Sequence, residues 1–304
     1  MSVSLGSPHV GPVEVTAGLR LGATTGWLLV PVAATCAVAT LAWDGLLTGP
    51  AVMNGSAKGT ALVVLAAALP LLVVSLWVGP AGSRWAMIGA LGATAYLLYN
   101  AVLFIFATPF NQMFLGYVAM LGLALWTLVL LLVTALTQPI GAEVRHRGVA
   151  LFMGVVVLLN ALAWLVRILP ATFDERPLSV MDGTGLTTSP LYVQDLAIWL
   201  PAFAWLAVEL WRGTSLFLVP AAGALLFWTI ESVGVAVDQW WGHHADPTSD
   251  VASGAVVPLF LLLAVGTAVA LVSLVRRVVH TESAVMSRHA AEAAGEGASS
   301  ASST

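Results

Sequence analysis

Eight stretches of apolar residues, each long enough to cross a membrane, lie along the chain. A helical span needs about 20 mostly apolar residues. Such stretches occupy 24–43, 58–78, 85–107, 113–136, 148–169, 192–211, 214–237 and 254–275. The chain is 59% hydrophobic and only 9% charged, whereas a soluble domain carries about 25% charged residues. We therefore predict an all-α, polytopic transmembrane helix bundle, and we exclude a soluble enzyme or a nucleic-acid-binding protein.

The residues outside the spans form two tails and a set of loops. A polar tail, 1–23, precedes the transmembrane domain, 24–276. The tail 277–304 ends in a run of Gly, Ala and Ser that buries little apolar surface, so we expect it to be disordered. The connection 171–191 is the longest on its side of the membrane, and its prolines and glycines favour an irregular excursion over the bundle.

The basic residues predict the orientation, because Lys and Arg are enriched in cytoplasmic loops. With the N-terminus inside, most of the 11 basic residues fall on the inner side: Arg20, Arg84, Arg145, Arg147, Arg212, Arg276, Arg277 and Arg288. The outer side holds Lys58, Arg167 and Arg176. We therefore predict that both termini are inside. The Ala-, Val- and Leu-rich composition, with Arg in place of Lys, favours a bacterial cytoplasmic membrane. The apolar spans thus indicate the lipid bilayer as a partner, and the sequence identifies no protein partner.

Several chemistries lack their sequence signatures. The chain contains no G-x-x-x-x-G-K-[ST], H-E-x-x-H or G-x-S-x-G motif, which disfavours an ATPase, a zinc protease and a serine hydrolase. No histidine lies inside a predicted span, and the single lysine, Lys58, stands at the outer edge of one, which disfavours intramembrane haem and a lysine-bound retinal. We assign no catalytic residue and expect no cofactor, and the absence of catalytic motifs argues against an enzyme.

Four predicted spans carry polar stripes at helical spacing, and polar stripes turn away from lipid. They comprise Tyr96, Tyr99 and Asn100; Asn160, Trp164 and Arg167; Tyr192, Asp195 and Trp199; and Trp228, Glu231, Ser232, Val235 and Asp238. We expect them to meet in an outward-facing pocket in which Arg167 faces Asp195 or Glu231. The candidate ligand-binding residues are Tyr99, Asn100, Asn160, Arg167, Asp195, Glu231 and Asp238. Glu231 is the strongest candidate, because it lies deepest in its span.

Two roles for these residues remain open at this stage. They form a site that binds or translocates a small polar ligand or ion, or they hold the helices together, as hydrogen-bonding side chains often do in membranes. An enzyme acting on a lipid or lipid-linked substrate is a third, less favoured hypothesis. Glu209 lies three residues before Arg212 and is expected to pair with it.

A second polar run, 238–246, contains the adjacent histidines His243 and His244. Histidines beside carboxylates can bind a divalent metal. Consecutive side chains point in different directions, so we favour a solvated loop anchored by Trp240 and Trp241 and treat the histidines only as weak metal candidates.

Two sequence stretches carry a family resemblance. They are Tyr99-Asn100-Ala101 continuing through Pro109–Tyr117, and Pro190–Leu196. They resemble patterns in a family of uncharacterised bacterial multi-pass membrane proteins, and the resemblance covers roughly residues 56–230. It implies a multi-pass membrane protein and transfers no activity and no site residue.

Overall fold

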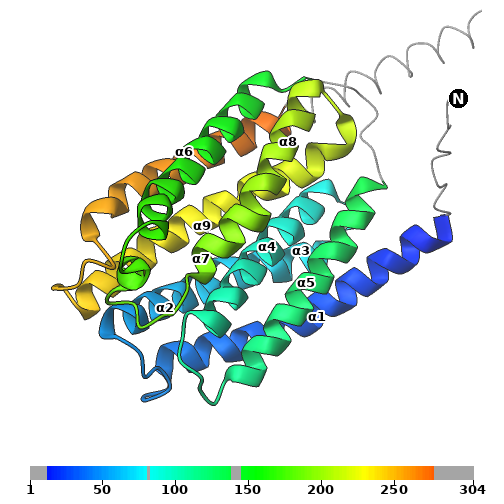
Figure 1. Cartoon of the computed structure of the whole chain (residues 1–304). Helices are drawn as coiled ribbons and strands as arrows, with labels where there is room; N and C mark the ends of the chain where they lie inside the picture. The colour runs from blue at the N-terminus through cyan, green and yellow to red at the C-terminus, as the bar shows by residue number, and fades with distance from the viewer. Residues whose placement is uncertain (1–11, 81–82, 138–144, 277–304) are drawn as a thin grey trace, which may run out of the picture.

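The computed structural model describes residues 12–80, 83–137 and 145–276, which contain 8 helices long and apolar enough to span a membrane (Figure 1). The spans are Gly18–Ala42, Ala51–Val78, Arg84–Phe106, Phe114–Leu136, Arg147–Thr172, Pro190–Arg212, Ser215–Ala245 and Gly254–Arg276. These ranges contain no β-strand. The predicted all-α bundle of eight spans is confirmed, and each predicted span overlaps one of these helices. The predicted C-terminal tail, 277–304, lies outside the described residues.

Within the spans, regular α-helices alternate with short turns of other helix types. The elements are α1 (Pro12–Ala42), α2 (Ala51–Val63), η1 (Val64–Ala68), α3 (Leu69–Val78), α4 (Arg84–Phe106), α5 (Phe114–Leu136), α6 (Arg147–Thr172), η2 (Pro177–Met181), α7 (Pro190–Gln194), η3 (Asp195–Trp199), α8 (Leu200–Arg212), η4 (Ser215–Phe217), α9 (Leu218–Ala245) and η5 (Gly254–Val256). We call the helix that follows η5, within Gly254–Arg276, the final span.

Three helices extend beyond their predicted ends by about two helical turns or more. α1 begins at Pro12, inside the predicted tail 1–23; α2 begins at Ala51; and α9 continues to Ala245. α2 and α9 pack closely here: a Cβ atom at Gly55 would lie 2.7 Å from the carbonyl oxygen of Trp241. Small residues permit such a close approach of two helices. The polar turns at these helix ends are stabilised by the neighbouring helix, so the length of the apolar stretch does not predict them.

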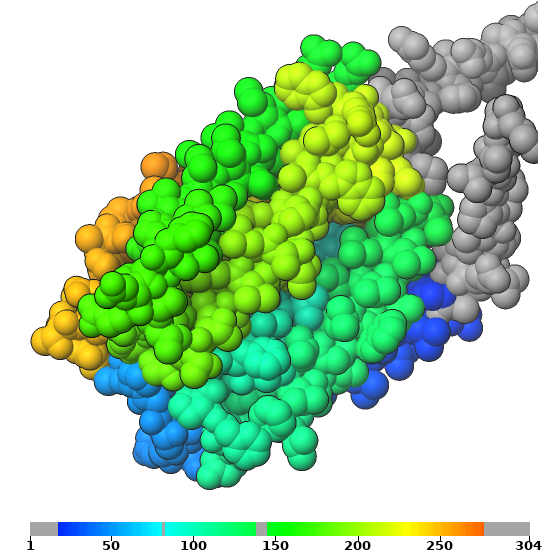
Figure 2. All heavy atoms as spheres, in the orientation of Figure 1, coloured from blue at the N-terminus to red at the C-terminus, as the bar shows by residue number. Residues whose placement is uncertain are grey.

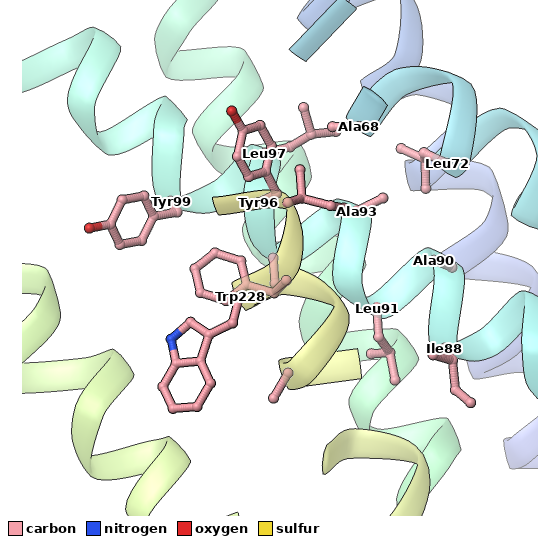
Figure 3. Packing of buried hydrophobic residues seen from close by; sticks show 14 of the residues in the cluster. Ala68, Leu72, Ile88, Ala90, Leu91, Ala93, Tyr96, Leu97, Tyr99 and Trp228 are labelled. Atoms are coloured by element: carbon pink, nitrogen blue, oxygen red, sulfur yellow. The ribbon is translucent and has the colours of Figure 1, made fainter. Parts of the chain in front are cut away.

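α4 and α9 occupy the centre of the bundle, as Figure 1 shows. They cross where Gly92 meets Gly223: a Cβ atom at Gly92 would lie 2.8 Å from Cγ of Leu226, and one at Gly223 would lie 2.9 Å from Cβ of Leu91. Figure 3 shows the buried side chains of α4 around this core, with Tyr96 and Tyr99 leaving the helix in different directions. α6 and α8 contribute much of the outer surface seen in Figure 2.

The two halves of the chain share a pattern of helix irregularities. η1 and η3 are both five-residue π-helical turns, and each is followed by Leu-Pro, at Pro70 and Pro201. The starts of η1 and η3, residues 64 and 195, are 131 residues apart, as are residues 70 and 201. A proline ring clashes with the carbonyl group four residues earlier. A π turn relieves this clash, because its hydrogen bond runs to the fifth residue back.

The same offset relates the two halves further along the chain. Gly92 and Gly223, which form the central crossing, differ by 131 residues, and so do the helix-capping positions Ser83 and Thr214. One neighbour relation also corresponds: α1 packs on α5, and α6 packs on the final span, where Phe152 lies against Gly266. The bundle therefore consists of two four-span halves, related across the contact between α4 and α9.

The two ends of the bundle carry opposite charges. The loops 43–50, 107–113, 173–189 and 246–253 form one end, here called the acidic end for Asp44, Asp174, Glu175, Asp182, Asp246 and Asp250. The other end, the basic end, carries Arg84, Arg145, Arg147, Arg212 and Arg276. The loop 173–189 crosses the acidic end, because Gly183 lies against Val251 and Gly185 lies against Pro50.

Candidate functional site

Polar side chains from four membrane-spanning helices gather in the half of the bundle nearer the acidic end. We call this set the polar cluster. It comprises Tyr96, Tyr99 and Asn100 of α4, Trp164 of α6, Gln194 of α7, Asp195 of η3, and Glu231 and Asp238 of α9. The predicted meeting of the stripes on these four spans is therefore present for Tyr99, Asn100, Asp195 and Glu231, which form hydrogen bonds between helices.

Asp195 joins three helices. Its Oδ1 accepts a hydrogen bond of 3.0 Å from the hydroxyl group of Tyr99, and its Oδ2 accepts one of 2.8 Å from Nε1 of Trp164. The side chain is buried, at 5% exposure. Asp195 is also the first residue of the π turn η3, and such turns frequently occur at functional sites. Both carboxylate oxygens are thus held by neutral donors.

Asn100 and Glu231 connect the two central helices. Nδ2 of Asn100 donates to Oε2 of Glu231 at 3.3 Å, and also to the carbonyl oxygen of Tyr96 at 3.0 Å. Asn100 is buried, whereas Glu231 is partly exposed. The two residues are 131 positions apart, so they occupy corresponding places in the two halves of the chain and face each other across the centre of the bundle.

Aromatic rings enclose the cluster on the side of the basic end. Trp199 lies with its ring centroid 4.9 Å from Phe227 and 5.8 Å from Tyr99. The amide group of Gln194 links this layer to the cluster: its oxygen accepts from Nε1 of Trp199 at 3.3 Å, and its Nε2 donates to the carbonyl oxygen of Tyr99 at 3.4 Å. Gln194 is not among the residues predicted for the pocket, although a glutamine beside Asp195 inside an apolar span is a signal that the sequence contains.

Asp238 lies farther along α9, toward the acidic end. Its Oδ1 accepts from Nε2 of Gln239 at 3.2 Å, and its backbone carbonyl accepts from the hydroxyl group of Ser56 at 3.2 Å. Oε1 of Gln239 in turn accepts from the backbone N–H of Ser253, at 3.0 Å. This hydrogen bond ties the end of α9 to the loop 246–253, so Asp238 lies beneath the acidic surface.

Arg167 and Asn160 do not join the cluster. Arg167 is exposed and forms no ion pair with Asp195 or Glu231 within the described ranges, so the predicted pairing of these charges is wrong. The physical reason is that neutral donors already occupy both oxygens of Asp195, and Trp164 is the α6 residue that reaches it. Arg167 instead lines a surface hollow of about 280 Å³ with Asp174 and Ser179. Asn160 is half-buried and forms no hydrogen bond to the cluster among the described residues.

The histidine run is helical, which corrects the predicted loop. His243 and His244 belong to the last turn of α9, and the ring of His244 lies 3.9 Å from that of Trp240. Across the described residues, no group of three or more His, Cys, Asp and Glu side chains is arranged to hold a metal ion. Lys58 also lies within a span, because α2 begins at Ala51, so the argument from the absence of intramembrane lysine does not hold.

Glu209 forms the predicted pair at the basic end. Its Oε1 lies 3.0 Å from the guanidinium group of Arg212, and its Oε2 accepts a 2.7 Å hydrogen bond from the hydroxyl group of Thr214. This pair stabilises the end of α8 and is separate from the polar cluster.

Comparison with known proteins gives no family assignment. The chain matches none of the protein-family models, curated proteins or solved structures with which it was compared. The fold and site define a multi-pass membrane protein with eight spans and a polar cluster in its interior.

Proposed function

We propose that this protein binds or translocates a small polar ligand or ion at the polar cluster. The observation that supports the proposal is the charge balance of the cluster. Asp195, Glu231 and Asp238 lie within spans and accept hydrogen bonds from neutral donors, with no ion pair to any of them among the described residues. Uncompensated carboxyl groups inside a membrane are costly, and they mark the pathways of substrates, ions and protons.

The proposed setting is a bacterial cytoplasmic membrane with both termini inside. The arginines of the basic end support this orientation, since positive residues favour the cytoplasmic side. The cluster then lies in the outer half of the membrane, where Gln239 connects it to the loop 246–253. Reporter fusions or cysteine labelling in the loops 43–50 and 246–253 test the orientation, and labelling of these loops from the cytoplasmic side would reverse it.

A ligand-dependent change in stability tests the function. Purified protein in nanodiscs is heated with a panel of monovalent cations, at several pH values, and with small polar metabolites. At least one condition should shift the melting temperature of the wild type and leave that of Glu231→Gln unshifted. Glu209→Gln is the matched control, because it also removes a carboxylate from a span but lies outside the cluster. It should respond like the wild type.

A structural role is the second candidate, because Asp195 hydrogen-bonds α4 and α6 to η3. In that case Glu231→Gln changes only the baseline melting temperature, and no component of the panel shifts the wild type. That outcome would overturn the ligand-binding proposal.

A further inference from the structure

One polar group in the cluster has no hydrogen-bond partner. The hydroxyl group of Tyr96 is fully buried, and no described residue donates to it or accepts from it. A buried hydroxyl group without a hydrogen-bond partner costs free energy. The hydrogen bonds described above do not explain why a tyrosine occupies this position.

The Tyr96 hydroxyl group lies against Gly234 of α9, where a Cβ atom would approach it to 2.8 Å. Glu231 is three residues before Gly234 and Asp238 is four residues after it, and residues at these spacings share one face of a helix. The phenol oxygen therefore lies along α9 between two carboxyl groups, and glycine is the residue that leaves room for it there.

Neither carboxyl group has a basic partner in the described ranges. Asn100 donates to Glu231, and Gln239 donates to Asp238. The titratable or charged groups on the elements around α9 are Arg84, Tyr96 and Tyr99 of α4, Asp195 of η3, Lys58 of α2, Tyr117 of α5, Glu209 and Arg212 of α8, Asp246 and Asp250 of the loop 246–253, and Arg276 of the final span. The last turn of α9 itself carries His243 and His244. Among the residues that the structure describes, Lys58 forms no ion pair, and Arg212 pairs with Glu209.

We propose that the ligand of this site is a proton, which enters from the acidic end and is shared by Asp238, Tyr96 and Glu231. This inference rests on the proposed function and specifies its ligand. A hard metal cation such as Ca²⁺ takes six or more oxygen ligands, whereas the described residues form no group of three or more metal-ligating side chains. A proton requires only a carboxyl oxygen and a hydrogen-bonded neighbour.

The transfer balances without charging the phenol. The carboxyl group of Asp238 gives its proton to Oη of Tyr96, while the hydroxyl proton of Tyr96 passes to the carboxylate of Glu231. Asp238 becomes a carboxylate, Tyr96 stays neutral and Glu231 becomes a carboxylic acid. Because neither carboxyl group is within hydrogen-bonding distance of the phenol, the step needs a side-chain rotation or one bridging water.

Hydrogen bonds connect the site to one end of the bundle. Asp238 and Gln239 lead to the loop 246–253 and the carboxylates of the acidic end. In the opposite direction, α4 and α9 meet closely at Gly92 and Gly223, with Leu91 and Leu226 packed around them. A proton from the acidic end therefore stops at Glu231 as long as this crossing remains closed.

The test follows the protonation of Glu231 after a rapid pH change. Infrared difference spectra of the full chain in nanodiscs report the carboxyl C=O band, and its absence in Glu231→Gln assigns it. Tyr96→Phe should keep the band but slow its exchange by about tenfold or more, since a positioned proton-transfer group contributes at least that factor. Tyr117→Phe is the matched control, because Tyr117 is a buried tyrosine that bonds Thr40 instead. Its exchange should equal that of the wild type.

A second variant tests the proposal independently, in case Tyr96→Phe does not fold. Gly234→Ala keeps the tyrosine but displaces its hydroxyl group, so it should also slow the exchange. If both variants exchange as fast as Tyr117→Phe, or if the Glu231 band does not change with pH, the proton proposal is overturned. A cation or metabolite that still shifts the melting temperature in a Glu231-dependent way would then leave the proposed function standing with another ligand.

Discussion

The two halves of the bundle share a scaffold but differ in chemistry. Each half has a π turn followed by Leu-Pro in its second span, and each contributes one glycine to the central crossing. The three carboxyl groups of the polar cluster belong to the second half: Val64 corresponds to Asp195, Asn100 to Glu231, and Ala107 to Asp238. Between the halves, the first supplies the donors Tyr99 and Asn100 and the second supplies the carboxylate acceptors, while Trp164 and Gln239 donate within the second half.

This division shows which features serve the fold and which serve the site. A feature present in both halves, such as the π turn or the crossing glycine, shapes the scaffold. Asp195 and Glu231 accept hydrogen bonds from Tyr99 and Asn100 of the other half, and these bonds make the contact between the halves polar. Variants that make the two halves alike, or that disturb the features they share, therefore separate folding from function.

The largest effect is expected from placing an acid in the first half. Val64→Asp puts a carboxyl group at a fully buried position. The position corresponds to Asp195 but holds an apolar residue in the natural chain. An uncompensated buried charge costs about 3–5 kcal/mol. Equilibrium unfolding in mixed micelles measures this cost. Val64→Thr is the control of similar volume. A loss below about 1 kcal/mol would show that the first half also accommodates an acid.

A smaller loss is expected from making the second half apolar. Asp195→Val leaves the hydroxyl group of Tyr99 and the indole N–H of Trp164 without their acceptor. Two buried donors without partners cost about 2–3 kcal/mol together. The same unfolding measurement, repeated with Tyr99→Phe and Trp164→Phe in a double-mutant cycle, apportions the loss. If Asp195→Val is as stable as the wild type, the hydrogen bonds do not hold α4 and α6 to η3.

The shared crossing should respond equally to substitution on either side. Gly92→Ala and Gly223→Ala each bring a Cβ atom to within 2.9 Å of a leucine side chain on the other central helix. Such overpacking costs about 1–2 kcal/mol. Gly122→Ala is the control, since nothing lies within 4 Å of its Cβ position, and it should be neutral or slightly stabilising. A loss in only one of the two crossing variants would contradict the equivalence of the halves.

The sequence predicted the features that depend on one helix at a time. The number of spans follows from apolar length, and the polar faces of α4 and α9 follow from helical spacing, which placed Asn100 and Glu231 toward each other. The ends of α2 and α9 did not follow, because their polar turns are stabilised by Gly55 and Gly59 packing against the facing helix.

The features that depend on competition between side chains were not predictable in this way. Arg167 has the charge to pair with Asp195, but Trp164 is the α6 side chain that donates a hydrogen bond to that carboxylate. The correspondence of the halves was also hidden, because most matching positions hold different apolar residues. The π turns reveal it, and a π turn depends on hydrogen bonding in three dimensions.

The smallest effect is expected at the ion pair between Arg212 and Glu209 in the second half. Arg212→Ala removes the partner of Glu209, and Val78 is the residue of the first half that corresponds to Glu209. The arginine side chain is 67% exposed, and exposed ion pairs contribute about 0.5 kcal/mol or less. Thr214 continues to donate to the carboxylate of Glu209, so it keeps a hydrogen-bond partner. Unfolding in mixed micelles should therefore match the wild type within that amount. A loss of about 2 kcal/mol or more would lie beyond the range of surface substitutions. It would mean that the charges of the basic end hold α8 in place. The second half would then differ from the first by this ion pair as well as by the carboxyl groups of the polar cluster.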